Sequence, residues 1–109
     1  MKLLSIIIAT YNAGNTLDAC LTSITKQKSS EIELLIIDGG SSDKTLDIIH
    51  SYGDKIDVLI SEPDKGIYDA WNKGISHATG AWIMFIGADD ILVENSLSPY
   101  IQYVKQIST

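Results

Sequence analysis

Apolar and polar residues alternate along the chain in blocks that predict strands and helices in turn. Four short apolar runs are typical of strands, and the first two are apolar enough to be buried on both faces of a sheet. The runs cover residues 3–9, 33–37, 57–60 and 82–86. After each run, apolar side chains recur every three or four residues, which is the spacing of one helical face. The pattern therefore predicts a strand followed by a helix, four times over.

The residues that begin or end the expected helices are visible in the sequence. Asn15 is the expected N-cap of the first helix, which reaches residue 26, and Ser41, Ser42 and Asp43 are expected to cap the second. Gly80 is the expected C-terminal cap of the third helix, and the fourth covers residues 95–107. The apolar faces are, helix by helix, Leu17, Cys20, Leu21 and Ile24; Leu46, Ile49 and Tyr52; Ile67, Trp71, Ile75 and Ala78; and Leu97, Ile101 and Val104.

This order of elements predicts an α/β fold, with a mostly parallel sheet in a Rossmann-like three-layer α/β/α arrangement. The 109 residues are enough for one domain and not for two, so residues 1–109 are expected to form a single unit. Ligands of such sheets bind beyond the carboxyl ends of the strands. If the first strand lies between the second and the fourth, Asp38 and Asp89 stand about 10 Å apart across that edge. That span suits a nucleoside with its phosphates.

The charged residues limit the kinds of ligand that the chain can hold. The net charge is −6, and the basic residues are eight lysines with no arginine. Nucleic acid is therefore not an expected partner, because a phosphate backbone needs clustered positive charge. Any smaller anion has to be held by backbone N–H groups, a lysine or a metal cation. The single cysteine, Cys20, fits a reducing compartment, which favours a cytoplasmic location.

Two adjacent carboxylates, Asp89 and Asp90, follow the fourth predicted strand. Such a pair repels itself unless a cation compensates the charge. Mn²⁺ or Mg²⁺ takes one or two carboxylates and completes its ligands with substrate phosphates and water. The same pair is also typical of a turn that caps the next helix, and considered alone it favours that simpler interpretation.

Other polar residues at the predicted strand ends are candidates for binding a nucleotide. Thr10, Tyr11 and Asn12 follow the first strand, and the ring of Tyr11 could stack on a base, although an aromatic residue there more often only packs. Asp38 follows the second strand and could accept a base N–H, or equally form a turn before two glycines. Asp64 and Lys65 precede the third helix and could face ribose and phosphate.

Four stretches, taken in order, resemble the family-two inverting glycosyltransferases with the GT-A fold. They are residues 5–12 (SIIIATYN), 33–45 (ELLIIDGGSSDKT), 62–74 (EPDKGIYDAWNKG) and 80–90 (GAWIMFIGADD). The resemblance implies transfer of a sugar, with inversion, from a nucleotide-diphosphate sugar to a hydroxyl of a glycan or lipid-linked acceptor in cell-surface polysaccharide or glycoconjugate synthesis. It places Thr10, Tyr11 and Asp38 around the nucleoside. It places Asp89 and Asp90 at the ribose, the diphosphate and a Mn²⁺ or Mg²⁺ ion.

The chain departs from the pattern of that family in two respects. Family members often carry an acidic residue two positions before Asp89, where this chain has Gly87, so the metal would depend on Asp89 and Asp90. Members are usually longer, and their later half brings the acceptor site and the general base. The general base is therefore expected beyond residue 109, and the chain alone is expected to bind a donor but to turn over poorly.

Several alternatives stay open at this stage. One is a non-catalytic nucleotide-binding module, and another is a nucleotidyltransferase-like domain, which usually has a basic loop that residues 12–15 lack. A phospho-receiver domain is disfavoured because it needs its acidic pair after the first strand. The full-length protein could also associate with the inner face of a membrane, and an exposed sheet edge would favour a homodimer.

Overall fold

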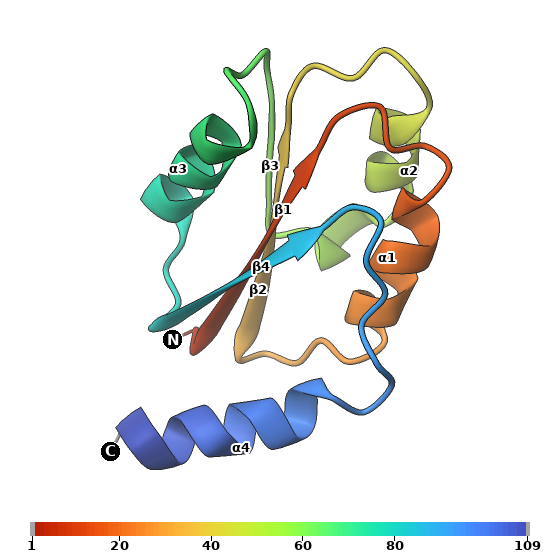
Figure 1. Ribbon diagram of the computed structural model, residues 1–109. Helices are drawn as coiled ribbons and strands as arrows, with labels where there is room; N and C mark the ends of the chain where they lie inside the picture. Colours follow the sequence, from red (N-terminus) through yellow and green to blue (C-terminus); the bar gives the residue numbers. More distant parts are fainter. Residues whose placement is uncertain (1, 109) are drawn as a thin grey trace.

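The structure is a computed structural model that describes residues 2–108, and its centre is one parallel sheet (Figure 1). The strands lie in the order β3–β2–β1–β4. Their bounds are β1 Leu4–Thr10, β2 Ile32–Asp38, β3 Val58–Ser61 and β4 Trp82–Gly87. The helices are α1 Leu17–Thr25, α2 Thr45–Ser51, α3 Ile67–His77 and α4 Leu97–Ser108, with a short 3₁₀ helix at Gly53–Lys55. The predicted α/β fold and the predicted alternation of strands and helices are confirmed.

β1 is the central strand, as the predicted site requires. It pairs in parallel with β2 on one side and with β4 on the other. The register sets Thr10 opposite Asp38 and Ala9 opposite Gly87, so the three strands end at the same level. Strands buried on both faces are nearly continuous apolar runs, and the two most apolar runs are the two strands in the middle of the sheet. Their buried polar residues, Ser5 and Glu33, pair with each other, because the Ser5 hydroxyl donates to the Glu33 carboxylate.

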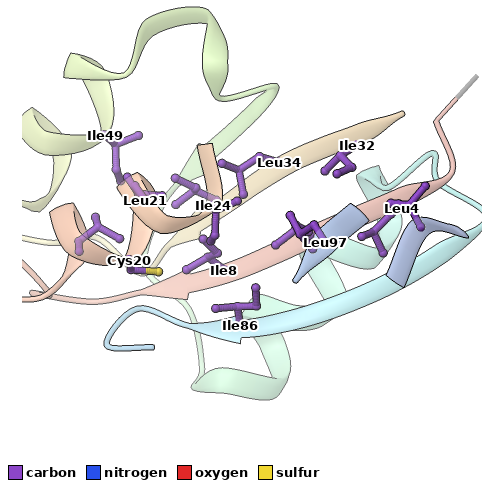
Figure 2. Close-up of a cluster of buried hydrophobic side chains, with 14 residues drawn as sticks. Leu4, Ile8, Cys20, Leu21, Ile24, Ile32, Leu34, Ile49, Ile86 and Leu97 are labelled. Carbon is purple, nitrogen blue, oxygen red and sulfur yellow. The ribbon is translucent and has the colours of Figure 1, made fainter. Parts of the chain in front are cut away.

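Helices cover both faces of the sheet, which confirms the three-layer arrangement (Figure 1). The larger hydrophobic cluster lies between the sheet and α1, where Ile8, Leu21 and Ile24 meet, and it continues to Leu4 and Leu97 beside α4 (Figure 2). The smaller cluster lies beneath α3, where Ile7, Leu35 and Ile37 pack against Ala70. Alternate residues of one strand thus enter opposite clusters, which is the two-residue period of a strand.

Two predicted helix caps are wrong. The first helix begins at Leu17, so Thr16 and not Asn15 stands at the N-cap, without a side-chain hydrogen bond. The third helix ends at His77 with Ala78 as its C-cap, so Gly80 lies beyond it. Tertiary packing explains the glycine instead, because a Cβ at position 80 would lie 2.6 Å from Ser5 Oγ and 2.7 Å from Ser5 N. The Gly80 N–H donates to that hydroxyl at 2.8 Å.

The second helix begins at Thr45, two residues after the predicted cap Asp43. Lys44 occupies the N-cap position, but Asp43 Oδ1 accepts the backbone N–H of Thr45 at 2.9 Å. The carboxylate thus satisfies a donor of the first turn, as the predicted cap would.

Within the part of the chain that the structure describes, no helix combines the length and the apolar character needed to cross a bilayer.

Gly74 allows α3 to lie close to the sheet, and this contact leads to a stability prediction. A Cβ at this buried position would lie 2.6 Å from Cγ2 of Ile7, which is itself buried. Overpacking costs about 1–3 kcal/mol, and a contact this close favours the upper part of that range, while alanine gains ~1 kcal/mol in helix propensity. On balance we expect Gly74→Ala to lower the free energy of unfolding by about 1–2 kcal/mol. Urea denaturation measures the change.

Ser76→Ala, at an exposed position of the same helix, is the matched control, and we expect it to stay within about 0.5 kcal/mol of the unmodified chain. A Gly74→Ala chain as stable as this control would contradict the close contact between α3 and β1.

Candidate functional site at the carboxyl ends of the strands

The loops that follow β1 and β2 are fastened together by the side chain of Asn12. Its Oδ1 accepts the backbone N–H of Ser42 at 2.8 Å and that of Asp43 at 3.3 Å. Its own backbone N–H donates to Ser41 Oγ at 2.8 Å. Asn12 has a φ of 47°, a left-handed conformation that asparagine tolerates better than most residues. The structure therefore uses this predicted ligand residue to hold one loop on the other.

Asp43 and Thr45 fasten the same two loops from the side of β2. Asp43 Oδ2 accepts the backbone N–H of Gly14 at 3.0 Å, and Thr45 Oγ1 accepts that of Ala13 at 2.8 Å. The Thr45 hydroxyl donates to Asp43 Oδ1. These hydrogen bonds hold the pKa of Asp43 below its ordinary value, with Thr45 as the main cause. The two loops therefore form one unit above the sheet.

Asp38 is fully buried at the end of β2 and gathers hydrogen bonds from three strand ends. Oδ1 accepts the hydroxyls of Thr10 at 2.7 Å and Ser41 at 2.6 Å. Oδ2 accepts the backbone N–H groups of Gly40 at 3.0 Å and Ser41 at 2.8 Å, and the hydroxyl of Ser61 at 2.9 Å. Burial acts to raise the pKa of Asp38, but these donors, led by Ser41, outweigh it and leave the pKa below its ordinary value.

A hollow of about 270 Å³ opens between the end of β1 and the start of α3. It is lined by Ala9, Thr10, Tyr11, Asp64, Gly66, Ile67 and Ala70. The side chain of Tyr11 is 67% exposed, so its ring is available to a ligand. Asp64 accepts the backbone N–H of Gly66 at 3.1 Å, which fixes one carboxylate oxygen at the rim.

Gly39 lets Asp64 approach the loop after β2. A Cβ at position 39 would lie 2.9 Å from Asp64 Oδ2. Three of the predicted nucleotide-binding residues, Thr10, Tyr11 and Asp64, are thus brought together at one hollow. Lys65 stands outside the lining and is exposed, with its backbone N–H donated to Asp69 Oδ2 at 2.9 Å. Asp69 and Lys73, four residues apart on α3, form an ion pair at 3.5 Å.

Asp89 and Asp90 are exposed after β4 and turn back over Gly87. Asp90 Oδ2 accepts the Gly87 N–H at 2.9 Å, and the Asp90 N–H donates to the Gly87 carbonyl at 3.1 Å. Oxygens of both carboxylates stand close to the point where a Cβ of residue 87 would be, at 3.1 Å for Asp89 Oδ1 and 3.0 Å for Asp90 Oδ2. The expected turn is present, but the pair does not cap the next helix, which begins only at Leu97. The turn is compatible with a shared cation, because it brings the two carboxylates to one side.

The donor set at this turn suits a hard cation that keeps other ligands. Residues 2–108 contain no group of three or more His, Cys, Asp or Glu that could hold a metal ion. A cation at this turn would have Asp89 and Asp90 as its protein ligands. Mg²⁺ and Mn²⁺ accept such a set when phosphate and water complete it. The pKa of Cys20 on α1 is raised to about 11, mainly by burial. The negative charges of Asp90 and Asp89 add to this rise.

Several residues that shape the site were missed by the sequence analysis. Ser41 was assigned only to a helix cap, and Ser61 received no role, yet both donate to the buried carboxylate of Asp38. The close fit of Gly39 against Asp64 was also missed. A cluster of hydroxyl residues just after a strand-end aspartate is the signal that could have found Ser41. Ser61 required knowledge that β3 lies beside β2.

Comparison with known proteins assigns the family. Residues 5–109 match the sequence profile of Glycosyl transferase family 2. The chain belongs to this family. A PGL/p-HBAD biosynthesis glycosyltransferase of Mycobacterium tuberculosis is 46% identical over 94 residues, which are 83% of this chain and 36% of that protein. The glucosyltransferase WfgD of Escherichia coli is 38% identical over 100 residues, or 91% of this chain and 40% of that protein.

Solved structures agree with this assignment. Staphylococcus aureus TarS, residues 1–349, superimposes with a TM-score of 0.86 at 27% identity, over 97% of this chain and 33% of that one. A mannosyltransferase of Pyrobaculum calidifontis shares the fold alone, with a TM-score of 0.81 at 21% identity. The fold is thus of the GT-A type, which confirms the resemblance found in the sequence. The family-2 chain described here spans little more than a third of the length of these relatives.

The buried carboxylate of Asp38 predicts an acid-sensitive stability. Its pKa is lower in the folded chain than the unfolded value of about 3.9. The stabilisation is therefore complete above that value and is lost as the pH falls through the folded pKa. We expect Asp38→Asn to lower the free energy of unfolding at pH 7 by about 2 kcal/mol or more, since an amide cannot accept all these donors. Urea denaturation at pH 7 and below pH 4 measures both effects.

Asp47→Asn is the control for this experiment, because Asp47 is exposed on α2. The Asp47→Asn chain should be as stable as the unmodified chain at pH 7. It should also lose as much stability as the unmodified chain when the pH is lowered. The Asp38→Asn chain should lose less on acidification, because one acid-sensitive group is gone. Equal acid sensitivity in both variants would show that Asp38 does not contribute as described.

Proposed function

We propose that this chain is the donor-binding part of a glycosyltransferase that moves a sugar from a nucleotide-diphosphate sugar to a hydroxyl acceptor. The observation that carries the proposal is a hollow at the end of β1 together with an exposed carboxylate pair at the end of the neighbouring strand β4, in a family-2 chain. A nucleoside in the hollow would direct its diphosphate along the strand ends toward that pair. Ligands of open parallel sheets bind at this edge.

The residues divide into those that would touch the donor and those that support it. Tyr11 would stack on the base, and Asp64 and Thr10 would offer polar atoms at the walls of the hollow. Exposed Lys65 would add positive charge near the phosphates. Asn12 and Asp38, whose oxygens are engaged within the chain, would act through the loops that they hold in place. Their predicted place at the nucleoside is retained in this indirect form.

Asp89 and Asp90 would hold a Mn²⁺ or Mg²⁺ ion together with the diphosphate. Such an ion neutralises the charge that builds on a departing diphosphate. The chain has no arginine to do so, and its two carboxylates stand on the same side of Gly87. The mannosyltransferase of Pyrobaculum calidifontis, which shares the fold, is described in complex with GDP-Man and Mn²⁺. Asp89 would also lie near the ribose, as the resemblance implies.

The names of the relatives suggest the wider role. WfgD is named a UDP-Glc:alpha-D-GlcNAc-diphosphoundecaprenol beta-1,3-glucosyltransferase, and TarS has been solved with UDP-GlcNAc. We therefore infer a role in cell-surface glycan synthesis with a glycan or lipid-linked acceptor. A lipid-linked acceptor would place the reaction at the cytoplasmic face of the membrane. The acceptor site and the general base are proposed to lie in a region corresponding to the further length of the relatives.

A donor screen tests this function. Isothermal titration of the chain with UDP, GDP and TDP should show a preference for one base, and Mn²⁺ should tighten its binding by about tenfold or more, which is about 1.4 kcal/mol. Replacing both carboxylates, as Asp89→Asn with Asp90→Asn, should remove the effect of Mn²⁺ because the cation loses its protein ligands. Asp54→Asn, at an exposed position in the 3₁₀ helix, is the control.

The same titration tests the hollow through its aromatic residue. Tyr11→Ala should weaken binding with and without Mn²⁺ by about 1–3 kcal/mol, the usual contribution of stacking on a base. Tyr103→Ala is the control, since Tyr103 is 60% exposed on α4. Absence of binding by any of the three diphosphates in Mn²⁺ would contradict the proposal. Binding without sugar transfer by a protein of the relatives' length would favour a nucleotide-binding module.

A further inference from the structure

Three side chains at helical spacing face the segment that carries Asp89 and Asp90. Cys20 and Ser23 belong to α1, and Gln27 lies in the turn that follows the helix. Residues three and four apart share one side of a helix. In Figure 1 the segment between β4 and α4 runs alongside α1 before α4 begins. The side chains of α1 are thus placed to meet this segment along its length.

Each of the three side chains reaches a backbone group of the segment or of its ends. Ser23 Oγ accepts the Leu92 N–H at 2.9 Å. Gln27 Nε2 donates to the Val93 carbonyl at 2.8 Å, and Gln27 Oε1 accepts the Leu97 N–H at 2.9 Å. Cys20 Sγ lies 3.5 Å from the Gly87 carbonyl, a weak donor contact. Both ends of the segment and its middle are therefore tied to one helix.

Apolar packing holds the middle of this segment mainly through Leu92, which is partly buried against the larger cluster. Its neighbours Ile91 and Val93 are 67% and 74% exposed, so their burial contributes little. A hollow of about 410 Å³ lies between the segment and the end of α1, and Lys26 and Glu94 are among the residues that line it. The segment also has no regular secondary structure to satisfy its backbone groups. Side-chain hydrogen bonds therefore add to this limited packing and take the place of the backbone ladder that usually fixes a chain.

We propose that Ser23 and Gln27 are positioning residues of the donor site, which hold the turn of Asp89 and Asp90 at the end of β4. This inference rests on the proposed function, because it assigns the turn to the diphosphate and its cation. Two adjacent carboxylates repel each other and favour an extended, solvated chain. A tether just after them, at Leu92 and Val93, opposes that tendency. The cation would then find its two ligands already on one side.

Two variants test the tether, each with a matched control. Gln27→Met keeps the length of the side chain and removes its hydrogen bonds, and Gln102→Met is its control at an exposed position of α4. Ser23→Ala is the milder variant. Ser51→Ala is its control, since Ser51 Oγ bonds back to the Ile48 carbonyl as Ser23 Oγ does to the Cys20 carbonyl.

Two measurements are made on the chain as it stands. Amide hydrogen exchange follows residues 88–96, and calorimetry follows binding of UDP with and without Mn²⁺ and of uridine without metal. We expect Gln27→Met to speed exchange in the segment and to reduce the Mn²⁺-dependent gain in UDP affinity, each by about five- to tenfold. Ser23→Ala should shift both in the same direction by less. Uridine binding should change less than about twofold, because the hollow at Tyr11 is not part of the tether.

The possible failures are distinguishable. If Mn²⁺ does not change the UDP affinity of the unmodified chain, the proposed metal site is overturned. The role given to the turn is then overturned as well. Unchanged exchange in Gln27→Met overturns the tether itself. Faster exchange with unchanged Mn²⁺ dependence, or a parallel loss of uridine binding, also overturns the inference, because the side chain then serves stability in general and not the position of the carboxylates.

Discussion

The buried carboxylate of Asp38 is the interaction on which the arrangement of the strand ends depends. A charge without contact with water is tolerated only when donors surround it, and the chain supplies them from β1, from the loop after β2 and from β3. Those donors come from elements far apart in sequence, so satisfying the carboxylate also fixes the distance between them. The loop that meets Asn12, and the wall of the hollow beside Thr10, both follow from that constraint.

Environment, and not residue type, separates the roles of the aspartates. Asp38 is buried and its oxygens accept hydrogen bonds from the surrounding strand ends, so it stabilises the fold. Asp89 and Asp90 are exposed. One carboxylate oxygen of Asp90 accepts the Gly87 N–H, and Asp89 Oδ1 lies beside the same glycine. An acidic chain can bind a polyanion only where a cation intervenes or where backbone donors dominate. A cation held by the exposed pair, as proposed, would reduce repulsion in the protein and in the ligand at once.

Much of the fold was predictable from sequence because strand burial leaves a direct pattern. The apolar runs of β1 and β2 required helices on both faces. The place of β1 between β2 and β4 was only assumed from the sequence, and the structure has that order. The caps at Asn15 and Gly80 failed because a cap preference is worth about 1 kcal/mol and tertiary contacts such as the one between Gly80 and Ser5 override it. The convergence of Thr10, Tyr11 and Asp64 on one hollow follows from their places near the strand ends, but the contacts of each side chain could not be predicted from the sequence. Whether Asn12 meets a ligand or a neighbouring loop depends on the partner that folding brings within 3 Å of its oxygen.

The two sides of the candidate site are held by different physical means, and this difference has a consequence for how a donor would enter. The proposed nucleoside side includes Ala9 and Thr10 at the end of β1, a strand buried between two hydrophobic clusters. The proposed diphosphate side is held by a few hydrogen bonds from α1 and the turn after it and by the partly buried Leu92, while Ile91 and Val93 are exposed. Segments with few buried contacts open at low cost. A base would therefore meet walls set by the sheet, while the turn of Asp89 and Asp90 would depend on the hydrogen bonds from Ser23 and Gln27 for its position before a cation binds.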